Sequence, residues 1–121
     1  MIKRWLTLAA VAVVLTGCYH QTTSTPPQTQ SETPALTEAS VEIKNFVFSP
    51  ATITVKPGAK ITVTNQDIPD HSLTSDDGKS FDTKLIAQGK SATITAPTAP
   101  GSYSFHCTPH PYMKGTLVVH E

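Results

Sequence analysis

Apolar and polar residues alternate along most of the chain from Val41 onward, so that side chains of one kind recur at every second position. A period of two is that of a β-strand, in which successive side chains point to opposite faces. Residues that favour turns, namely Pro, Gly, Asn and Asp, separate the alternating runs. The runs lie at 41–48, 51–58, 59–65, 90–96, 101–107 and 115–120.

This pattern predicts an all-β domain, because no segment shows the sustained apolar spacing of an amphipathic helix. About seven or eight short strands within about eighty residues are typical of an antiparallel β-sandwich or a small barrel. Alternation also predicts which side chains face the core. The expected core pairs are Ile53 with Val55, Ile61 with Val63, and Leu117 with Val119.

Residues 1–17 have the features of an export signal. Lys3 and Arg4 precede an apolar run at 5–16, which is shorter than the ~20 residues that a membrane-spanning helix requires. The run ends in LTGC, which resembles the lipobox of bacterial lipoproteins, where the signal is removed before the cysteine and the cysteine is acylated. We therefore expect Cys18 to carry lipid. An ordinary signal peptide with an incidental cysteine is the alternative.

Residues 18–40 are rich in Thr, Ser, Gln and Pro and contain almost no large apolar side chains. Such a composition buries too little surface to offset the entropy that is lost on ordering. The sequence therefore predicts a flexible tether at 18–40 and a globular domain at 41–121. The whole chain has nine basic and nine acidic residues, and no basic patch suggests a nucleic-acid partner.

Cys18 and Cys107 are the two cysteines of the chain. If lipid occupies Cys18, Cys107 is a lone thiol in an exported protein. Export compartments oxidise free thiols, so such a thiol should be buried, reactive for a purpose, or bound to a metal.

Strand alternation sorts the residues just before Cys107. Tyr103, Phe105 and Cys107 share one face, which their character marks as the inner face, so His106 must point outward. We therefore expect His106 to be exposed and not to be a metal ligand. His120, near the chain end, is expected to be a solvated strand residue.

Cys107, His110 and Met113 follow one another at intervals of three positions on one loop. Thiolate and thioether ligands favour copper, and imidazole also suits it. A trigonal set of two His and one Cys, with a distant axial Met, is typical of blue-copper electron-transfer centres. Such a set requires a second histidine, and His71 is the remaining domain histidine that lies beside a loop at the start of a strand.

Two prolines flank His110 in this loop and restrict its backbone. The first of them, Pro109, also has no N–H group to donate to the sulfur of Cys107, which leaves more electron density on that sulfur. Tyr112 belongs either to an apolar docking surface with the prolines or to the internal packing of the loop.

Three stretches together, FSPATITVKPGAKITVTNQD, PDHSL and GSYSFHCTPHPYMKGTLVV, resemble the cupredoxins, a family of small blue-copper proteins. Within that family the loop CTPHPYM is most similar to the amicyanins, with the plastocyanins and pseudoazurins as wider relatives. The resemblance covers residues 41–120. It implies a Greek-key β-sandwich and one type 1 copper, as Cu(I) or Cu(II), held by His71, Cys107, His110 and an axial Met113.

The resemblance also implies a function: such a protein shuttles single electrons between a donor and an acceptor redox protein and is not an enzyme. Together with the export signal and the lipid on Cys18, it predicts a monomer that is anchored to a membrane in the periplasm or at the cell surface. Three positions depart from the family, the first being Asp70, which directly precedes His71. Val63 stands where an aromatic residue is common, and Ser72 stands where Asn usually links the histidine loop to the cysteine loop; the Ser72 hydroxyl offers that link with a shorter reach.

Other interpretations of the same residues stay open. A copper carrier or delivery protein of the same fold would use the same ligands. A Cys–His hydrolase would use Cys107 as its nucleophile, although no oxyanion-hole motif is visible. A plain adhesion-type sandwich would bury Cys107 and Met113 as core residues. Zinc would be only an occupant of the site, because thioethers seldom bind structural zinc.

Overall fold

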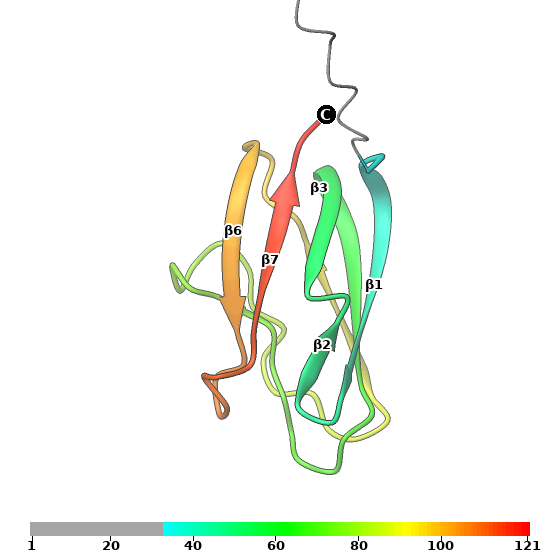
Figure 1. Ribbon diagram of the computed structural model, residues 1–121, viewed down its shortest axis with the longest axis vertical. Helices are drawn as coiled ribbons and strands as arrows, with labels where there is room; N and C mark the ends of the chain where they lie inside the picture. The colour runs from blue at the N-terminus through cyan, green and yellow to red at the C-terminus, as the bar shows by residue number, and fades with distance from the viewer. Residues whose placement is uncertain (1–32) are drawn as a thin grey trace, which may run out of the picture. The chain divides into compact units, whose positions relative to one another are not determined.

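The computed structural model describes residues 33–121, which form seven strands (Figure 1). Among these residues there is no helix, and hence none long and apolar enough to cross a membrane. The predicted all-β class and strand number are confirmed. Residues 1–17, Cys18 and most of the expected tether lie outside the described residues. The strands are β1 Leu36–Lys44, β2 Val47–Ser49, β3 Thr52–Asn65, β4 Thr74–Ser75, β5 Ser91–Thr95, β6 Gly101–His106 and β7 Lys114–Val119.

The strands pair in the order β2-β1-β3-β7-β6-β4, and β5 pairs with β3. The prediction of wholly antiparallel pairing is wrong for two pairs, because β3 runs parallel to both β1 and β7. The path of the chain explains the first parallel pair. β2 is antiparallel to β1, so the chain reverses its direction there. The second half of β3 then runs in the same direction as β1.

β3 contains both of the strands predicted at 51–58 and 59–65. Residues 52–55 pair with β7, whereas residues 60–65 pair with β1 and residues 60–64 also pair with β5. Val55 in addition lies opposite Leu36 at the start of β1. Between these halves Gly58 follows Pro57 and has φ +74°, which matches the Pro-Gly pattern of a type II turn. Figure 1 shows that β3 folds back on itself. β3 therefore connects the strand pair with β7 to the strand pairs with β1 and β5.

The start of the domain differs from the sequence expectation. β1 begins at Leu36, so residues 36–40, which were assigned to the tether, pair with β3 instead. These residues are mostly exposed, and their place depends on main-chain pairing with Val55 and residues 60–62. Apolar alternation therefore did not predict that residues 36–40 belong to a strand, because these residues bury few side chains.

The core follows the predicted alternation. All six side chains that were expected to face inward are buried, and they pack with aromatic and aliphatic residues from β1, β2 and β6. Phe105 and Cys107 are both fully buried, as the strand pattern before the loop predicts. The six are Ile53, Val55, Ile61, Val63, Leu117 and Val119.

Three connections lie together at one end of the strands: β1–β2, β3–β4 and β6–β7. In Figure 1 they form the lower end, whereas the C-terminus and the start of β1 lie at the upper end. The candidate ligands His71, Cys107, His110 and Met113 are carried by the second and third of these connections. The strand pairing therefore brings together residues that are far apart in the sequence.

Candidate metal centre

The ligand atoms of His71, Cys107 and His110 converge on one small space. The Nδ1 atoms of His71 and His110 lie 3.4 and 3.7 Å from the Sγ atom of Cys107. The two Nδ1 atoms lie 3.1 Å apart. His71 and Cys107 are fully buried, and His110 is partly exposed. These are the only three His, Cys, Asp or Glu side chains grouped closely enough to share an ion within residues 33–121.

These spacings fit a single metal ion. Bonds of about 2.0 Å to nitrogen and 2.3 Å to sulfur, at angles of about 100–120°, place the ligand atoms about 3.1–3.8 Å apart. The three distances fall within that range. Cys107 is the only cysteine within the described residues, where it is a free, buried thiol.

Met113 completes the loop that carries two of these ligands. Its side chain is buried, and three main-chain hydrogen bonds hold the loop closed. His110 N–H donates to the Cys107 carbonyl (3.2 Å), Met113 N–H donates to the His110 carbonyl (2.9 Å), and Cys107 N–H donates to the Met113 carbonyl (3.1 Å). Sequence spacing of three positions therefore becomes a compact loop with each candidate ligand at a hydrogen-bonded position.

His71 is held from both its main chain and its ring. Its backbone forms a two-way bridge with Ile86, with N–O distances of 3.2 and 2.7 Å. Its ring Nε2 lies 3.1 Å from the Asp67 Oδ2 atom. An ionised carboxylate only accepts, so Nε2–H donates and the Nδ1 atom that faces Cys107 keeps its lone pair. A metal ligand needs that lone pair.

Asp67 is a site residue that the sequence analysis missed. Burial acts to raise the pKa of Asp67, but the hydrogen bonds that its carboxylate accepts from Phe46, Asn45 and His71 outweigh burial and lower the pKa below its ordinary 3.8. The carboxylate is therefore ionised near neutral pH. No motif marks Asp67, since it was one of several aspartates in an acidic stretch that also suits turns.

Ser72 links the histidine loop to the cysteine loop, as its position in the sequence suggested. Its Oγ accepts a hydrogen bond from Thr108 N–H (2.9 Å) and donates one to Thr108 Oγ1 (3.1 Å). Its own N–H donates to Cys107 Sγ at 3.4 Å. The sulfur therefore accepts a main-chain hydrogen bond from the histidine loop, in addition to lacking a donor at Pro109.

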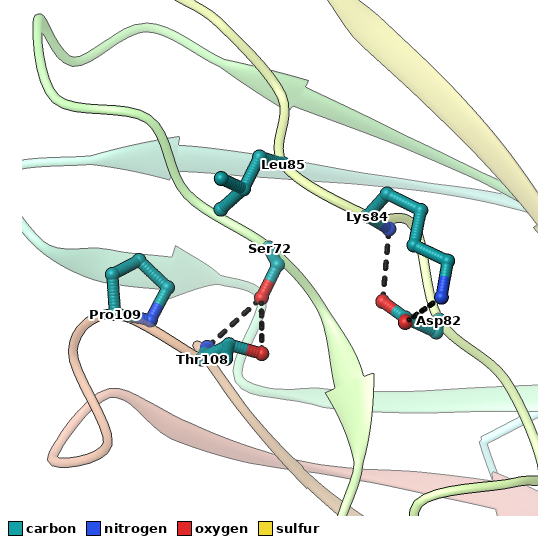
Figure 2. A pocket seen from close by; sticks show the side chains of 6 residues that line it. All are labelled: Ser72, Asp82, Lys84, Leu85, Thr108 and Pro109. Atoms are coloured by element: carbon teal, nitrogen blue, oxygen red, sulfur yellow. Dashed lines mark hydrogen bonds and ion pairs between the residues drawn. The ribbon is translucent and has the colours of Figure 1, made fainter.

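The Ser72–Thr108 contact forms part of the wall of an open pocket of about 580 Å³ beside the site. Figure 2 shows the Ser72 hydroxyl facing Thr108, with Pro109 and Leu85 next to them and the Asp82–Lys84 ion pair further away. At the rim of this pocket, Lys84 forms an ion pair with Asp82 (2.7 Å). The other lining residues, Ser72, Leu85, Thr108 and Pro109, carry no charge. This pocket belongs to the surroundings of the candidate metal centre.

An aromatic side chain from the β1–β2 turn covers the two imidazoles. The Phe46 ring lies 5.1 Å from the His71 ring and 5.0 Å from the His110 ring, nearly perpendicular to both. Tyr112 packs beside Phe46 but is 69% exposed, which favours the surface interpretation of this tyrosine over internal packing. Sequence analysis missed Phe46, because a place within the predicted strand at 41–48 says nothing about rings on two other loops.

The other domain histidines lie apart from this group. His106 is half-buried rather than exposed, and its Nδ1 lies 2.6 Å from an oxygen of Asp76. His106 lies opposite Thr74 in the β4–β6 pair. His120 is also partly buried, next to the chain end, and its Nδ1 lies 2.9 Å from the Glu121 carbonyl.

Comparison with known proteins places these features in a family. Residues 7–119 match the family model of the cupredoxin-like domain. The chain is similar to amicyanin from Paracoccus versutus, with 28% identity over 93% of this chain and 89% of that protein. It is also similar to plastocyanin from Nostoc punctiforme, with 33% identity over 61% of this chain and 65% of that protein.

Solved structures show the same fold. A reduced Cu(I) form of an amicyanin variant superposes with a TM-score of 0.60 and 23% identity, over 75% of this chain and 87% of that chain. A copper-containing nitrite reductase from Thermus scotoductus superposes with a TM-score of 0.60 and 25% identity. That match covers 74% of this chain but 23% of the reductase chain, so this chain spans about a quarter of the enzyme.

Proposed function

This chain belongs to the family of cupredoxin-like domains, and from that premise we propose that it is a one-electron carrier between redox partners outside the cytoplasm. Copper is the cofactor, and His71, Cys107, His110 and Met113 are arranged as a type 1 copper site. When bound, copper supplies a one-electron change between Cu(II) and Cu(I). The observation that carries the proposal is the convergence of two imidazole nitrogens and one thiol sulfur within 3.1–3.7 Å of one another.

The chemistry of this donor set supports copper over zinc. His71, Cys107 and His110 would supply the three closely spaced donors, and the buried Met113 thioether would supply the distant axial one. Thiolate and thioether are soft ligands that suit copper, and an axial Met tunes its redox potential. Structural zinc sites rarely use a thioether.

Stiffness of the ligands supports electron transfer. His71 is held by its main-chain bridge to Ile86 and by Asp67, and Cys107 and His110 lie on a loop closed by main-chain hydrogen bonds. Side chains that are already held in place change little when an ion changes its charge, so little reorganisation accompanies each electron transfer. These residues therefore support electron transfer by keeping the ligand positions fixed.

The surface around His110 supports docking of a redox partner. His110 is partly exposed, and apolar side chains surround it, including Phe46 and Tyr112 with Pro109 and Pro111. Apolar patches of this kind mark interaction sites, and weak redox encounters bury under about 1,200 Å² in total. The proposed partners are a donor and an acceptor protein that use this surface in turn.

The proposal includes export and anchoring. The signal at 1–17 and the acylated Cys18 would attach the domain to a membrane through the segment that precedes β1. The start of β1 lies at the end opposite the ligand loops (Figure 1), which supports an anchor that leaves the docking surface free. Mass spectrometry of the protein purified from bacterial membranes tests this: the expected chain begins at Cys18 and carries acyl groups, and an unmodified chain starting elsewhere would contradict it.

An absorption spectrum with a copper count tests the redox proposal. Oxidised, copper-loaded protein is expected to bind one copper per chain and to show an intense band at roughly 600 nm that disappears reversibly on reduction. Cys107→Ser is the matched control, since it removes the thiolate and should abolish the band while the fold stays largely intact. Fully loaded protein that is colourless, or a Cys107→Ser variant that stays blue, would contradict the proposal.

The rates of copper release and of electron exchange distinguish an electron carrier from the alternative, a copper carrier. An electron carrier should retain copper against a chelator and exchange electrons rapidly and reversibly. Rapid loss of copper to the chelator, together with sluggish reduction, would favour delivery of the metal instead.

A further inference from the structure

The Asp67 carboxylate joins two segments that both reach the candidate metal centre. It accepts hydrogen bonds from the Asn45 N–H (2.7 Å) and the Phe46 N–H (2.8 Å) in the β1–β2 turn. The Oδ2 atom that accepts from Phe46 also lies 3.1 Å from Nε2 of His71. The side chain of Asp67 is 11% exposed and that of His71 is 0% exposed, so water competes little for the bond to the ring.

The turn that Asp67 holds has an unusual backbone. Asn45 and Phe46 have φ values of +54° and +60°, a left-handed conformation that non-glycine residues rarely adopt and that surrounding contacts must maintain. Asp67 supplies such contacts at both consecutive N–H groups. This conformation directs the Phe46 ring over the His71 and His110 rings.

We propose that Asp67 is a positioning residue with two linked effects: it keeps His71 in the tautomer whose Nδ1 is free to bind the ion, and it keeps Phe46 as a cover over both imidazoles. The inference deepens the proposed copper function and rests on it for its metal-binding readouts. A carboxylate suits both tasks, because its two oxygens can accept from three donors at once. An amide in its place has a single acceptor oxygen and a competing N–H₂ group.

A merely structural role for Asp67, as a stabiliser of the β1–β2 turn, makes different predictions. Its loss would then lower the unfolding temperature without changing the His71 tautomer or the properties of bound copper. The tautomer, the rate of copper release and the reduction potential therefore decide between the two roles.

The first measurement needs no metal. In the metal-free full chain, nitrogen NMR shifts of the His71 ring should report a protonated Nε2 and an unprotonated Nδ1 in the wild type. Asp67→Asn should lose that preference. A wild-type His71 ring with its proton on Nδ1 would overturn the proposal without any variant, so the test survives even if Asp67→Asn fails to fold.

The second measurement uses copper-loaded protein. Asp67→Asn should release copper to a chelator about 10- to 100-fold faster, the range that loss of an outer-shell partner of a ligand typically costs. Its reduction potential should rise, because one negative charge is lost beside His71. Asp70→Asn is the matched control for copper release: it removes an equal charge from the exposed residue directly before His71, whereas the ring is bonded to Asp67, so it should release copper at the wild-type rate. Equal release rates for Asp67→Asn and Asp70→Asn would overturn the proposal.

Two further variants separate the linked effects. Asp67→Glu keeps the carboxylate and should retain more of the wild-type tautomer preference than Asp67→Asn. Phe46→Ala removes the cover but leaves the main-chain donors, so it should speed copper release while the His71 tautomer stays unchanged. If Phe46→Ala releases copper at the wild-type rate, the covering role is wrong.

These outcomes are distinguishable from failure of the proposed function. If the oxidised wild type lacks the blue band, the copper function fails, yet the metal-free NMR measurement still reports whether Asp67 controls the His71 ring. If the band is present and the Asp67 variants leave the tautomer, release rate and potential unchanged, the copper function stands and this inference fails.

Discussion

The sulfur of Cys107 has several close contacts in the candidate site. It is fully buried, lies within 3.7 Å of two imidazole nitrogens, and accepts one main-chain hydrogen bond from Ser72. Each hydrogen bond to a ligating sulfur withdraws electron density from it and so changes the redox potential of the metal. At the scale of single residues, Ser72 and Pro109 therefore act on the same atom, one by supplying a donor and the other by lacking one.

Met113 allows the axial position to be tested separately from the three close ligands. Met113→Leu conserves volume in a buried position and should cost less than about 1.5 kcal/mol of folding stability. The variant should still bind copper and remain blue, but its reduction potential should rise, because the thioether no longer supplies electron density to Cu(II). Voltammetry beside an absorption spectrum checks this. Loss of copper binding would show that Met113 is more than a weak axial ligand.

At the scale of elements, the β6–β7 hairpin explains how one loop presents Cys107, His110 and Met113. The two strands pair up to His106 and Lys114, so the loop begins and ends at a fixed position in the sheet. Phe105 lies opposite Gly115 in this register. A Cβ atom added at Gly115 would lie 2.2 Å from the Phe105 ring and 2.6 Å from the Ala51 carbonyl oxygen, so the ring occupies the space that a side chain would need.

Gly115→Ala should therefore destabilise the hairpin, because the Ala51 carbonyl is main chain and cannot move aside easily. We expect a loss of about 1–3 kcal/mol in the free energy of unfolding, as for other overpacked sites. Urea denaturation of the metal-free protein measures it. Ser102→Ala, at an exposed position of the partner strand β6, is the control and should change stability by less than about 0.5 kcal/mol. Equal stability of the two variants would refute the close packing.

The turn after β4 is stabilised by the carboxylate of Asp77. Hydrogen bonds from the Ser80 hydroxyl, the N–H groups of Lys79 and Ser80, and the Ser75 hydroxyl hold the pKa of Asp77 well below its ordinary value. A carboxyl whose pKa is lower in the folded than in the unfolded state stabilises the fold above the unfolded pKa of about 3.9 and loses this effect as the pH falls through the folded value. The turn should therefore weaken in acid.

Asp77→Asn should lower the urea midpoint of the metal-free protein at pH 7, and the gap to the wild type should narrow steadily below about pH 4. The sign follows because the amide cannot ionise and so lacks the pH-dependent contribution. Asp70→Asn, which removes an exposed carboxylate, serves as the control. A gap that stays constant from pH 7 to pH 3 would mean that ionisation of Asp77 does not stabilise the turn.

At the scale of the whole molecule, the core and the site are separate contributions. The buried aliphatic residues of β1, β3 and β7 form the core along the strands, whereas the candidate ligands lie on connections at one end. Main-chain hydrogen bonds hold the loops that carry these ligands: His71 is bridged to Ile86, and the loop from Cys107 to Met113 is closed by three bonds. We therefore expect the domain to fold before the metal binds.

Copper should accordingly raise stability without creating the fold. The metal-free chain is expected to show β-type circular dichroism and cooperative unfolding. A ligand at about 1,000 times its Kd that binds only the folded state contributes about 4 kcal/mol, which for a domain of this size corresponds to a rise in Tm of more than about 10 °C. Cys107→Ser should show a much smaller rise. An unfolded metal-free chain would contradict the separation of core and site.

The sequence by itself determined the features that depend on residues close together in the chain. Alternation sets which face of a strand is apolar, so the inward positions from Ile53 to Val119 could be assigned without a structure. Cys107, His110 and Met113 share one short loop, so their grouping also followed from spacing. The link through Ser72 came from the family resemblance, because Ser72 stands where an Asn usually joins the two loops.

Only the tertiary structure decided which distant groups meet. The contacts of Asp67 with Phe46 and Asn45 span 21 and 22 positions, and that of Ser72 with Thr108 spans 36. The parallel pairing of β3 and the start of β1 at Leu36 depend likewise on main-chain partners elsewhere in the chain. The physical reason is that a local pattern specifies the direction of a side chain, whereas the neighbour that it meets depends on the register and path of the strands that bring their connecting loops to one end.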